Sequence, residues 1–142
     1  MLGCVGLSGN IEEASRWMKQ AEKDVISAKN SIRSGDYEWA CFQSQQAAEK
    51  ALKAVLYFRG FRKVLTHSVF ELLRKVESVF GVRLEELSWA AKVLDSTYIS
   101  SRYPNAIAGS LAPFEYYGKE DAEKCVSYAE SILREAKKLI EK

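Results

Sequence analysis

The side chains of this sequence that are best suited to handle a phosphate ester are Arg102 and His67. A guanidinium can hold a phosphate through two parallel hydrogen bonds, and an imidazole can take up or release a proton near neutral pH. His67 is the only histidine of the chain. Each residue also has a structural interpretation, in which Arg102 packs on an aromatic ring or pairs with a carboxylate and His67 satisfies polar groups at a helix start. The sequence leaves the functional and the structural interpretation open for both Arg102 and His67.

Further hydrogen-bonding and cationic side chains could help to bind a nucleotide or another anion. Three of them flank Arg102 in a stretch rich in hydroxyl groups, and two lie on the polar face of a predicted helix. Such groups supply donors that match phosphate oxygens. The candidate anion-binding residues beside Arg102 are Ser101, Tyr103, Asn105, Lys50 and Lys53.

The same predicted helix carries a polar stripe that includes Gln46, Glu49 and Lys53. Glu49 and Lys53 are four residues apart in the order that favours an ion pair, and such a pair stabilises a helix only slightly. A solvated helix face therefore accounts for the stripe. Glu49 also shares a line with Leu52 and Leu56, so a polar network inside the bundle or at a dimer seam accounts for it equally well.

The elements that position these residues are predicted to be helices. Residues 37–59 contain no proline and no glycine, and small or apolar side chains recur after four and then three residues, which is typical of a helix with one packed face. Because the middle of this stripe consists of Cys, Ser and Ala, a neighbouring helix can approach closely. The stripe residues are Tyr37, Cys41, Ser44, Ala48, Ala51, Val55 and Phe58.

The helix that precedes residues 37–59 is predicted at about 11–33. Asn10 can cap its start, and Gly35 can take the left-handed conformation that ends it. Asp36 can then cap the next helix through its carboxylate. So short a link makes the two helices an antiparallel hairpin.

The second half of the chain is predicted to contain shorter helices and one irregular segment. Thr66 or Ser68 can cap a helix that Gly81 ends, and apolar residues then continue the helical spacing. With no strand signal, these elements predict an all-α fold, an up-and-down antiparallel bundle of four to five helices. We expect helices at about 69–80, 84–94 and 122–139, an irregular segment at 105–118, and one domain over 11–142 behind a flexible N-terminus, 1–10.

The composition excludes several classes of protein and of site. A net charge of +2 on 142 residues is too small for a broad nucleic-acid or membrane footprint, so any anion site must be local. The cysteines Cys4, Cys41 and Cys125 lack metal-binding spacing, and we therefore expect no metal site and no cofactor. The chain has no run of about 18 apolar residues and no signal-peptide pattern, which predicts a cytoplasmic protein.

Three short motifs make the chain resemble the HEPN domain family (higher eukaryotes and prokaryotes nucleotide-binding), in its small stand-alone prokaryotic form. They are QQAAEKALKA at residues 45–54, Thr66-His67-Ser68, and Ser101-Arg102-Tyr103-Pro104. The resemblance implies a helical bundle, usually a homodimer, that is often encoded beside a minimal nucleotidyltransferase as a two-component, toxin–antitoxin-like module. It also implies nucleotide or RNA as a ligand and, for many members, metal-independent cleavage of RNA.

The chain departs from the family's catalytic motif, in which an arginine is followed after four to six residues by a histidine. Counted from Arg102, those positions hold Ile107, Ala108 and Gly109, none of which can titrate. The favoured interpretation is a dimeric HEPN-type module that acts with a partner nucleotidyltransferase and binds nucleotide, without the usual Arg/His pair. Two alternatives stay open: a metal-independent RNase that uses Arg102 with a displaced base such as His67, and a purely structural helical dimer.

Overall fold

The computed structural model describes the backbone of residues 6–141 and the side chains from Asn10 onward. Within these residues the fold is all-α and has no strand, as the sequence predicts. Residues 1–5 of the predicted flexible N-terminus, Cys4 among them, lie outside the described part. The elements are α1 (Gly6–Ser34), α2 (Tyr37–Phe58), α3 (Val69–Phe80), η2 (Glu85–Leu87), α4 (Ser88–Ser96), η3 (Pro104–Ala106), α5 (Pro113–Tyr116) and α6 (Lys119–Ile140), where η marks a short 3-10 helix.

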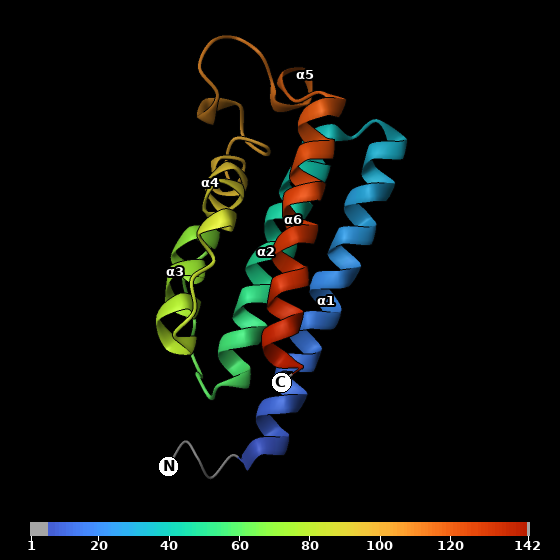
Figure 1. Ribbon diagram of the computed structural model, residues 1–142. Coiled ribbons are helices and arrows are strands. Elements are labelled where there is room, and N and C mark those ends of the chain that lie inside the picture. Colours follow the sequence, from blue (N-terminus) through green and yellow to red (C-terminus); the bar gives the residue numbers. More distant parts are fainter. Residues whose placement is uncertain (1–5, 142) are drawn as a thin grey trace.

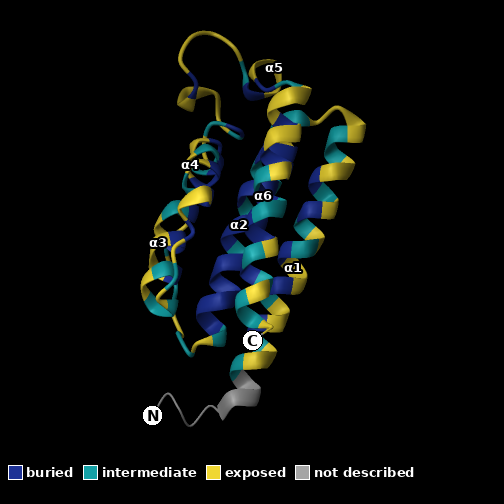
Figure 2. Ribbon diagram, in the orientation of Figure 1, coloured by how far each residue is buried: buried dark blue, intermediate teal, exposed yellow. Residues whose placement is uncertain are grey.

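Helix α2 is the centre of the bundle and contacts α1, α3, α4, α5 and α6. Figure 1 shows α1, α2 and α6 as long neighbouring helices, with α3 and α4 together on another side. In Figure 2, α2 is buried along most of its length, whereas α1 and α6 have exposed outer faces. Alanine permits this burial because a methyl side chain lets neighbouring helices approach on several sides. The fully buried alanines of α2 are Ala40, Ala47, Ala48, Ala51 and Ala54.

The link between α1 and α2 is as short as predicted, but the predicted N-caps of both helices are wrong. Gly35 has a φ of 80°, in the left-handed region that glycine adopts without strain. Asp36 stands directly before α2, but its carboxylate accepts no hydrogen bond from the start of that helix. Asn10 lies inside α1, which begins at Gly6. A capping residue marks a possible helix start only, and a helix can extend past it.

Helices α3 and α4 form a second hairpin, whose ends agree with the sequence. The Ser68 hydroxyl caps α3 by accepting a hydrogen bond from the Glu71 amide at 3.1 Å. Gly81 ends the helix with a φ of 65°. The next helix begins with the 3-10 turn η2 before α4, a detail that helical spacing alone did not predict.

The segment 105–118, predicted to be irregular, contains most of η3 and the single turn α5. Each of these short helices has a proline at its first position, Pro104 and Pro113, where the missing amide hydrogen costs nothing. They escape a prediction based on periodicity because they are three and four residues long.

Candidate functional site around Tyr98

His67 and Arg102, the two residues that the sequence suggests for contact with a phosphate, both lie against the ring of Tyr98. The imidazole of His67 stacks on this ring, with 5.4 Å between ring centroids and 17° between ring planes. The guanidinium carbon of Arg102 lies 4.7 Å from the centroid of the same ring. His67 precedes α3 and Arg102 follows α4, so the α3–α4 hairpin places both at one end. The sequence alone did not place them together.

Arg102 is held by aromatic rings and by one backbone carbonyl. Its Nε and Nη2 both donate to the carbonyl oxygen of Tyr98, at 2.9 and 2.7 Å. Its guanidinium carbon also lies 4.3 Å from the ring of Phe42 and 5.2 Å from that of Tyr103. Among residues 10–141 Arg102 forms no ion pair with a carboxylate. The aromatic packing is thus the observed structural role, and it leaves the positive charge uncompensated by the described side chains.

His67 lies on a connector that runs back along α2. The amide of Gln45 donates to the His67 carbonyl at 2.8 Å, and Nδ1 of His67 lies 3.3 Å from Oε2 of Glu49. The imidazole is 59% exposed, whereas the Glu49 side chain beneath it is 6% exposed. One edge of the ring therefore faces a buried carboxylate and most of the rest faces solvent.

Asp95, a residue that the sequence did not single out, anchors the backbone next to His67. From α4 it accepts hydrogen bonds from the Ser68 hydroxyl at 2.8 Å and from the amides of Val69 and Phe70 at 2.7 and 3.0 Å. These bonds satisfy the free amides at the start of α3 and join the two helices. Only the tertiary fold shows this role, because Asp95 is far from α3 in sequence.

The polar stripe of α2 is an internal network rather than a solvated face. Glu49 is 4% exposed and Lys53 is 5% exposed. Nζ of Lys53 lies 3.0 Å from Oε2 of Glu49, and the Gln46 amide donates to Oε1 of Glu49 at 3.3 Å. Lys53 also lies over the ring of Trp17, 5.8 Å from its centroid. Lys53 is therefore a buried partner of Glu49 and is not presented to a ligand.

The remaining candidate anion-binding residues are distributed over two regions. Tyr103 is half exposed and contacts Arg102, and Asn105 is exposed in η3. Ser101 is 2% exposed, and its hydroxyl has no hydrogen-bond partner within the described residues. Lys50 does not join them, because it pairs with Asp24 of α1 at 2.6 Å.

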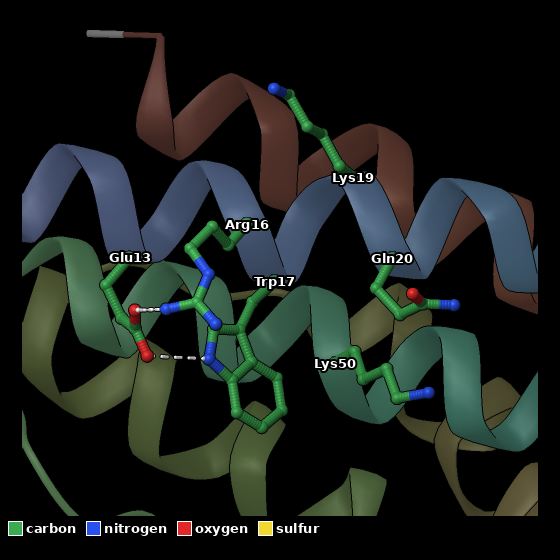
Figure 3. A pocket seen from close by; sticks show the side chains of 6 residues that line it. All are labelled: Glu13, Arg16, Trp17, Lys19, Gln20 and Lys50. Atoms are coloured by element: carbon green, nitrogen blue, oxygen red, sulfur yellow. Dashed lines mark hydrogen bonds and ion pairs between the residues drawn. The ribbon is translucent and has the colours of Figure 1, made fainter.

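Lys50 instead lines a groove of about 570 Å³ between α1 and α2, shown in Figure 3. The Glu13 carboxylate bridges two side chains there, accepting from Nη1 of Arg16 at 2.9 Å and from the indole nitrogen of Trp17 at 3.1 Å. Two of the groove's three cations, Arg16 and Lys50, thus already contact carboxylates of α1. The lining residues are Glu13, Arg16, Trp17, Lys19, Gln20 and Lys50.

Buried titratable groups near the top of α2 are held in their neutral forms. A hydrogen bond with Cys125, together with burial, strongly raises the pKa of the Cys41 thiol, which is therefore no nucleophile at neutral pH. Burial also raises the pKa of Tyr117, and a hydrogen bond with Ser100 opposes that shift.

Comparison with known proteins gives a consistent result over most of the chain. The HEPN domain family model matches residues 14–139. The protein named "Putative toxin MJ1304" from Methanocaldococcus jannaschii is 36% identical over 130 residues, which cover 87% of this chain and 86% of that one.

Solved structures agree with this match. TT1696 from Thermus thermophilus has a TM-score of 0.83 and 38% identity, over 89% of this chain and 98% of that one. ST0689, described as an archaeal HEPN homologue, has a TM-score of 0.75 and 39% identity, over 90% and 98%. Within the described residues, no helix has the length and apolar character needed to cross a membrane.

Proposed function

Because this chain belongs to the HEPN domain family, we propose that it is the HEPN component of a two-component, toxin–antitoxin-like system and that it binds a nucleotide or RNA phosphate at Arg102. The toxin name of its relative from Methanocaldococcus jannaschii supports the first half of this proposal. The expected partner is a minimal nucleotidyltransferase, and the expected assembly of this chain is a homodimer. The family match also confirms the resemblance seen in the sequence.

The observation that carries the binding proposal is the uncompensated charge of Arg102. Three aromatic rings and a carbonyl oxygen fix the guanidinium, and none of them neutralises it. A phosphate bound there gains a charge-assisted hydrogen bond without having to displace a carboxylate. Tyr103, half exposed beside Arg102, offers a ring face on which a nucleobase can stack.

Thermal unfolding with added nucleoside triphosphates tests the binding half. A ligand at about 100 times its dissociation constant stabilises the folded protein by about 2.7 kcal/mol. We expect Arg102→Ala to lower this stabilisation by about half or more, and Arg16→Ala, in the α1–α2 groove, to retain it. The absence of stabilisation by any nucleotide would overturn the binding proposal and leave a purely structural helical dimer as the better interpretation.

Co-purification with the product of the neighbouring reading frame, expected to be a minimal nucleotidyltransferase, tests the assembly half together with sedimentation of each protein alone. We expect a stable complex and a dimer of this chain. A monomer that does not bind the neighbouring protein would contradict this half of the proposal.

A second candidate function, metal-independent cleavage of RNA, is favoured by the contact of both His67 and Arg102 with the Tyr98 ring. In this reaction the ribose 2′-oxygen bonds to the adjacent phosphorus, and the bond from phosphorus to the 5′-oxygen breaks. Nε2 of His67 accepts the 2′-hydroxyl proton, and Arg102 stabilises the phosphorane. The 5′-oxygen takes a proton from water, and the hydroxide formed takes the proton back from His67, which restores the base.

Incubation of the protein with a mixed RNA pool in the presence of EDTA tests this candidate. Cleavage to 2′,3′-cyclic phosphate ends that disappears in both Arg102→Ala and His67→Ala would establish it. Intact RNA, or cleavage that persists in either variant, would exclude this mechanism.

A further inference from the structure

We propose that the α3 side of the molecule is a docking surface for an acidic segment of a partner protein. The surface carries six cations from the connector 59–68, from α3 and from α4, and we call it the α3 basic surface. Its cations are Arg59, Arg62, Lys63, Arg74, Lys75 and Lys92. None of them belongs to the Tyr98 cluster, so the role of this surface goes beyond the proposed function and does not depend on binding at Arg102.

Positive charge is concentrated in this part of the chain. Residues 59–75 contain five cations and one carboxylate, that of Glu71, which gives the segment a charge of +4. The whole chain has a net charge of only +2, so the remaining residues together carry −2. In Figure 2, exposed residues recur along α3 and the connector that leads to it. The segment is therefore a local source of positive potential that attracts anionic partners.

Most of these cations lack a carboxylate partner. All six are exposed to solvent, and five form no ion pair among residues 10–141. Arg74 is the exception, because its Nε lies 3.6 Å from Oε1 of Glu77. Incoming carboxylates thus meet five exposed charges that no described carboxylate of the chain already pairs.

Aromatic rings hold two of the unpaired cations where the connector lies against α3. The guanidinium carbon of Arg59, on the connector, lies 4.7 Å from the centroid of the Phe80 ring on α3. In the other direction, Nζ of Lys75 on α3 lies 4.8 Å from the ring centroid of Phe61 on the connector. These two contacts place the cations of both elements on one part of the surface.

Helix α4 adds a further cation to this surface through the ring of Phe70. Nζ of Lys92 lies 5.0 Å from the centroid of that ring, and the guanidinium carbon of Arg74 lies 5.6 Å from the same centroid. A cation that already rests on a ring loses less conformational freedom when a carboxylate binds it, which favours binding.

The covered rings favour a protein segment over a single-stranded nucleic acid. Proteins bind such strands with cations and with a series of bare rings on which successive bases stack. Here Phe61, Phe70 and Phe80 are partly buried, and each has a cation over it. Trp89, which is 68% exposed, lies one turn before Lys92 on α4. An exposed tryptophan beside cations is typical of the residues that dominate protein interfaces.

The length of α3 indicates the length of the bound segment. The helix has 12 residues and is about 18 Å long. An extended peptide rises about 3.3 Å per residue, so about six residues span it, and side chains on one side recur every 7 Å or about that. Several carboxylates can then each meet a different cation. The cations need not converge on one point, as they would have to for a single phosphate.

Fluorescence anisotropy with a labelled peptide of sequence EELEELEE tests the proposal, and a labelled octamer of deoxythymidine provides the nucleic-acid comparison. At about 50 mM salt we expect the native chain to bind the peptide more tightly than the octamer, and added salt to weaken the binding. The triple variant Arg59→Gln/Lys75→Gln/Lys92→Gln should bind the peptide about tenfold more weakly.

The matched control is the triple variant Lys29→Gln/Lys137→Gln/Lys138→Gln. It removes the same charge from α1 and α6, where each lysine already pairs with a carboxylate. We expect its affinity for the peptide to stay within about twofold of that of the native chain. Arg102→Ala should also retain the peptide.

Amide chemical shifts of the native chain provide a second readout, which does not depend on the folding of a variant. On addition of the peptide, we expect the largest shift changes in residues 59–75 and around Lys92. Changes confined to other parts of the chain would contradict the proposed surface.

The outcomes separate this proposal from the binding of nucleotide at Arg102. No binding of the peptide, or an equal loss of affinity in both triple variants, would overturn the docking surface. Tighter binding of the octamer than of the peptide would overturn the choice of a protein partner. Loss of the peptide in Arg102→Ala would assign the acidic ligand to the Tyr98 cluster instead. A failure of nucleotides to bind leaves the α3 basic surface unaffected.

Discussion

Two regions of this molecule combine cations with aromatic rings, and they differ in how the cations are neutralised. The α1–α2 groove has a volume of about 570 Å³, and its Arg16 and Lys50 are bonded to Glu13 and Asp24. In the Tyr98 cluster, by contrast, Arg102 forms no ion pair with a carboxylate among residues 10–141. An anion that binds Arg16 or Lys50 in the groove must compete with the carboxylates of Glu13 and Asp24. The uncompensated charge of Arg102 among three aromatic rings is our reason to propose the Tyr98 cluster, rather than the groove, as the anion site.

The two ion pairs of α2 differ in another way, namely in how far they are exposed to water. Lys53 and Glu49 are each 6% exposed at their side chains, whereas Lys50 and Asp24 are 24% and 15% exposed. Water screens the second pair more than the first, so the consequences of breaking them should differ.

Replacing Lys53 should therefore have the largest effect on stability. Lys53→Met leaves the Glu49 carboxylate buried without its cation, and we expect a loss of about 3 kcal/mol in the free energy of unfolding. Lys50→Met, one turn earlier on α2, should cost about 1 kcal/mol or less. Urea denaturation of both variants measures the difference, and equal losses would show that burial does not distinguish the two pairs.

Removing the anchor beside His67 should rank second. Asp95→Ala deprives the start of α3 of three hydrogen bonds, and we expect a loss of about 2 kcal/mol by urea denaturation. The control is Asp36→Ala, because Asp36 precedes α2 without capping it, and it should change stability by much less. A larger loss for Asp36→Ala would contradict the assignment of caps.

The third prediction compares the two arginines as anion-binding groups. Arg102→Ala should weaken binding of adenosine 3′-monophosphate by at least about tenfold, which corresponds to about 1.4 kcal/mol. Arg16→Ala should leave the affinity unchanged, because Arg16 is already bonded to Glu13. Calorimetry on the two variants measures both affinities. If only Arg16→Ala lost affinity, the anion would bind in the groove and not at Arg102.

The smallest effect is expected for the stability of Arg16→Ala. The Arg16 side chain is 78% exposed, and an exposed pair with Glu13 contributes about 0.5 kcal/mol or less. A loss above about 1.5 kcal/mol in the free energy of unfolding, measured by urea denaturation, would contradict this. It would mean that Arg16 and Glu13 belong to a structural ion-pair network.

Much of the fold could be predicted from spacing and capping residues alone. The burial of one face of α2 follows from its stripe of small side chains, and the ends of α3 follow from Ser68 and Gly81. The stripe did not predict the burial of Ala40, Ala47 and Ala54, which lie on other faces of α2. The short turns η3 and α5 could not be predicted, because they contain too few residues for a helical period to show.

The site was only partly predictable. Arg102 and His67 stand out by residue type, but the stripe through Glu49 and Lys53 fits a solvated face as well as a buried network. Burial decides between the two, and burial depends on which helices cover α2. Asp95 has no local signal at all, since its hydrogen-bond partners belong to another helix.

The sequence by itself determined the longer helices, their order and the family, because helical spacing, capping and short motifs are local properties of the chain. The tertiary structure alone decided that His67 and Arg102 share one tyrosine ring, that Glu49 and Lys53 form a buried pair, and that Lys50 lines a different groove. These facts depend on how the α3–α4 hairpin and α1 pack against α2. Packing joins residues far apart in the chain, and no local pattern records it.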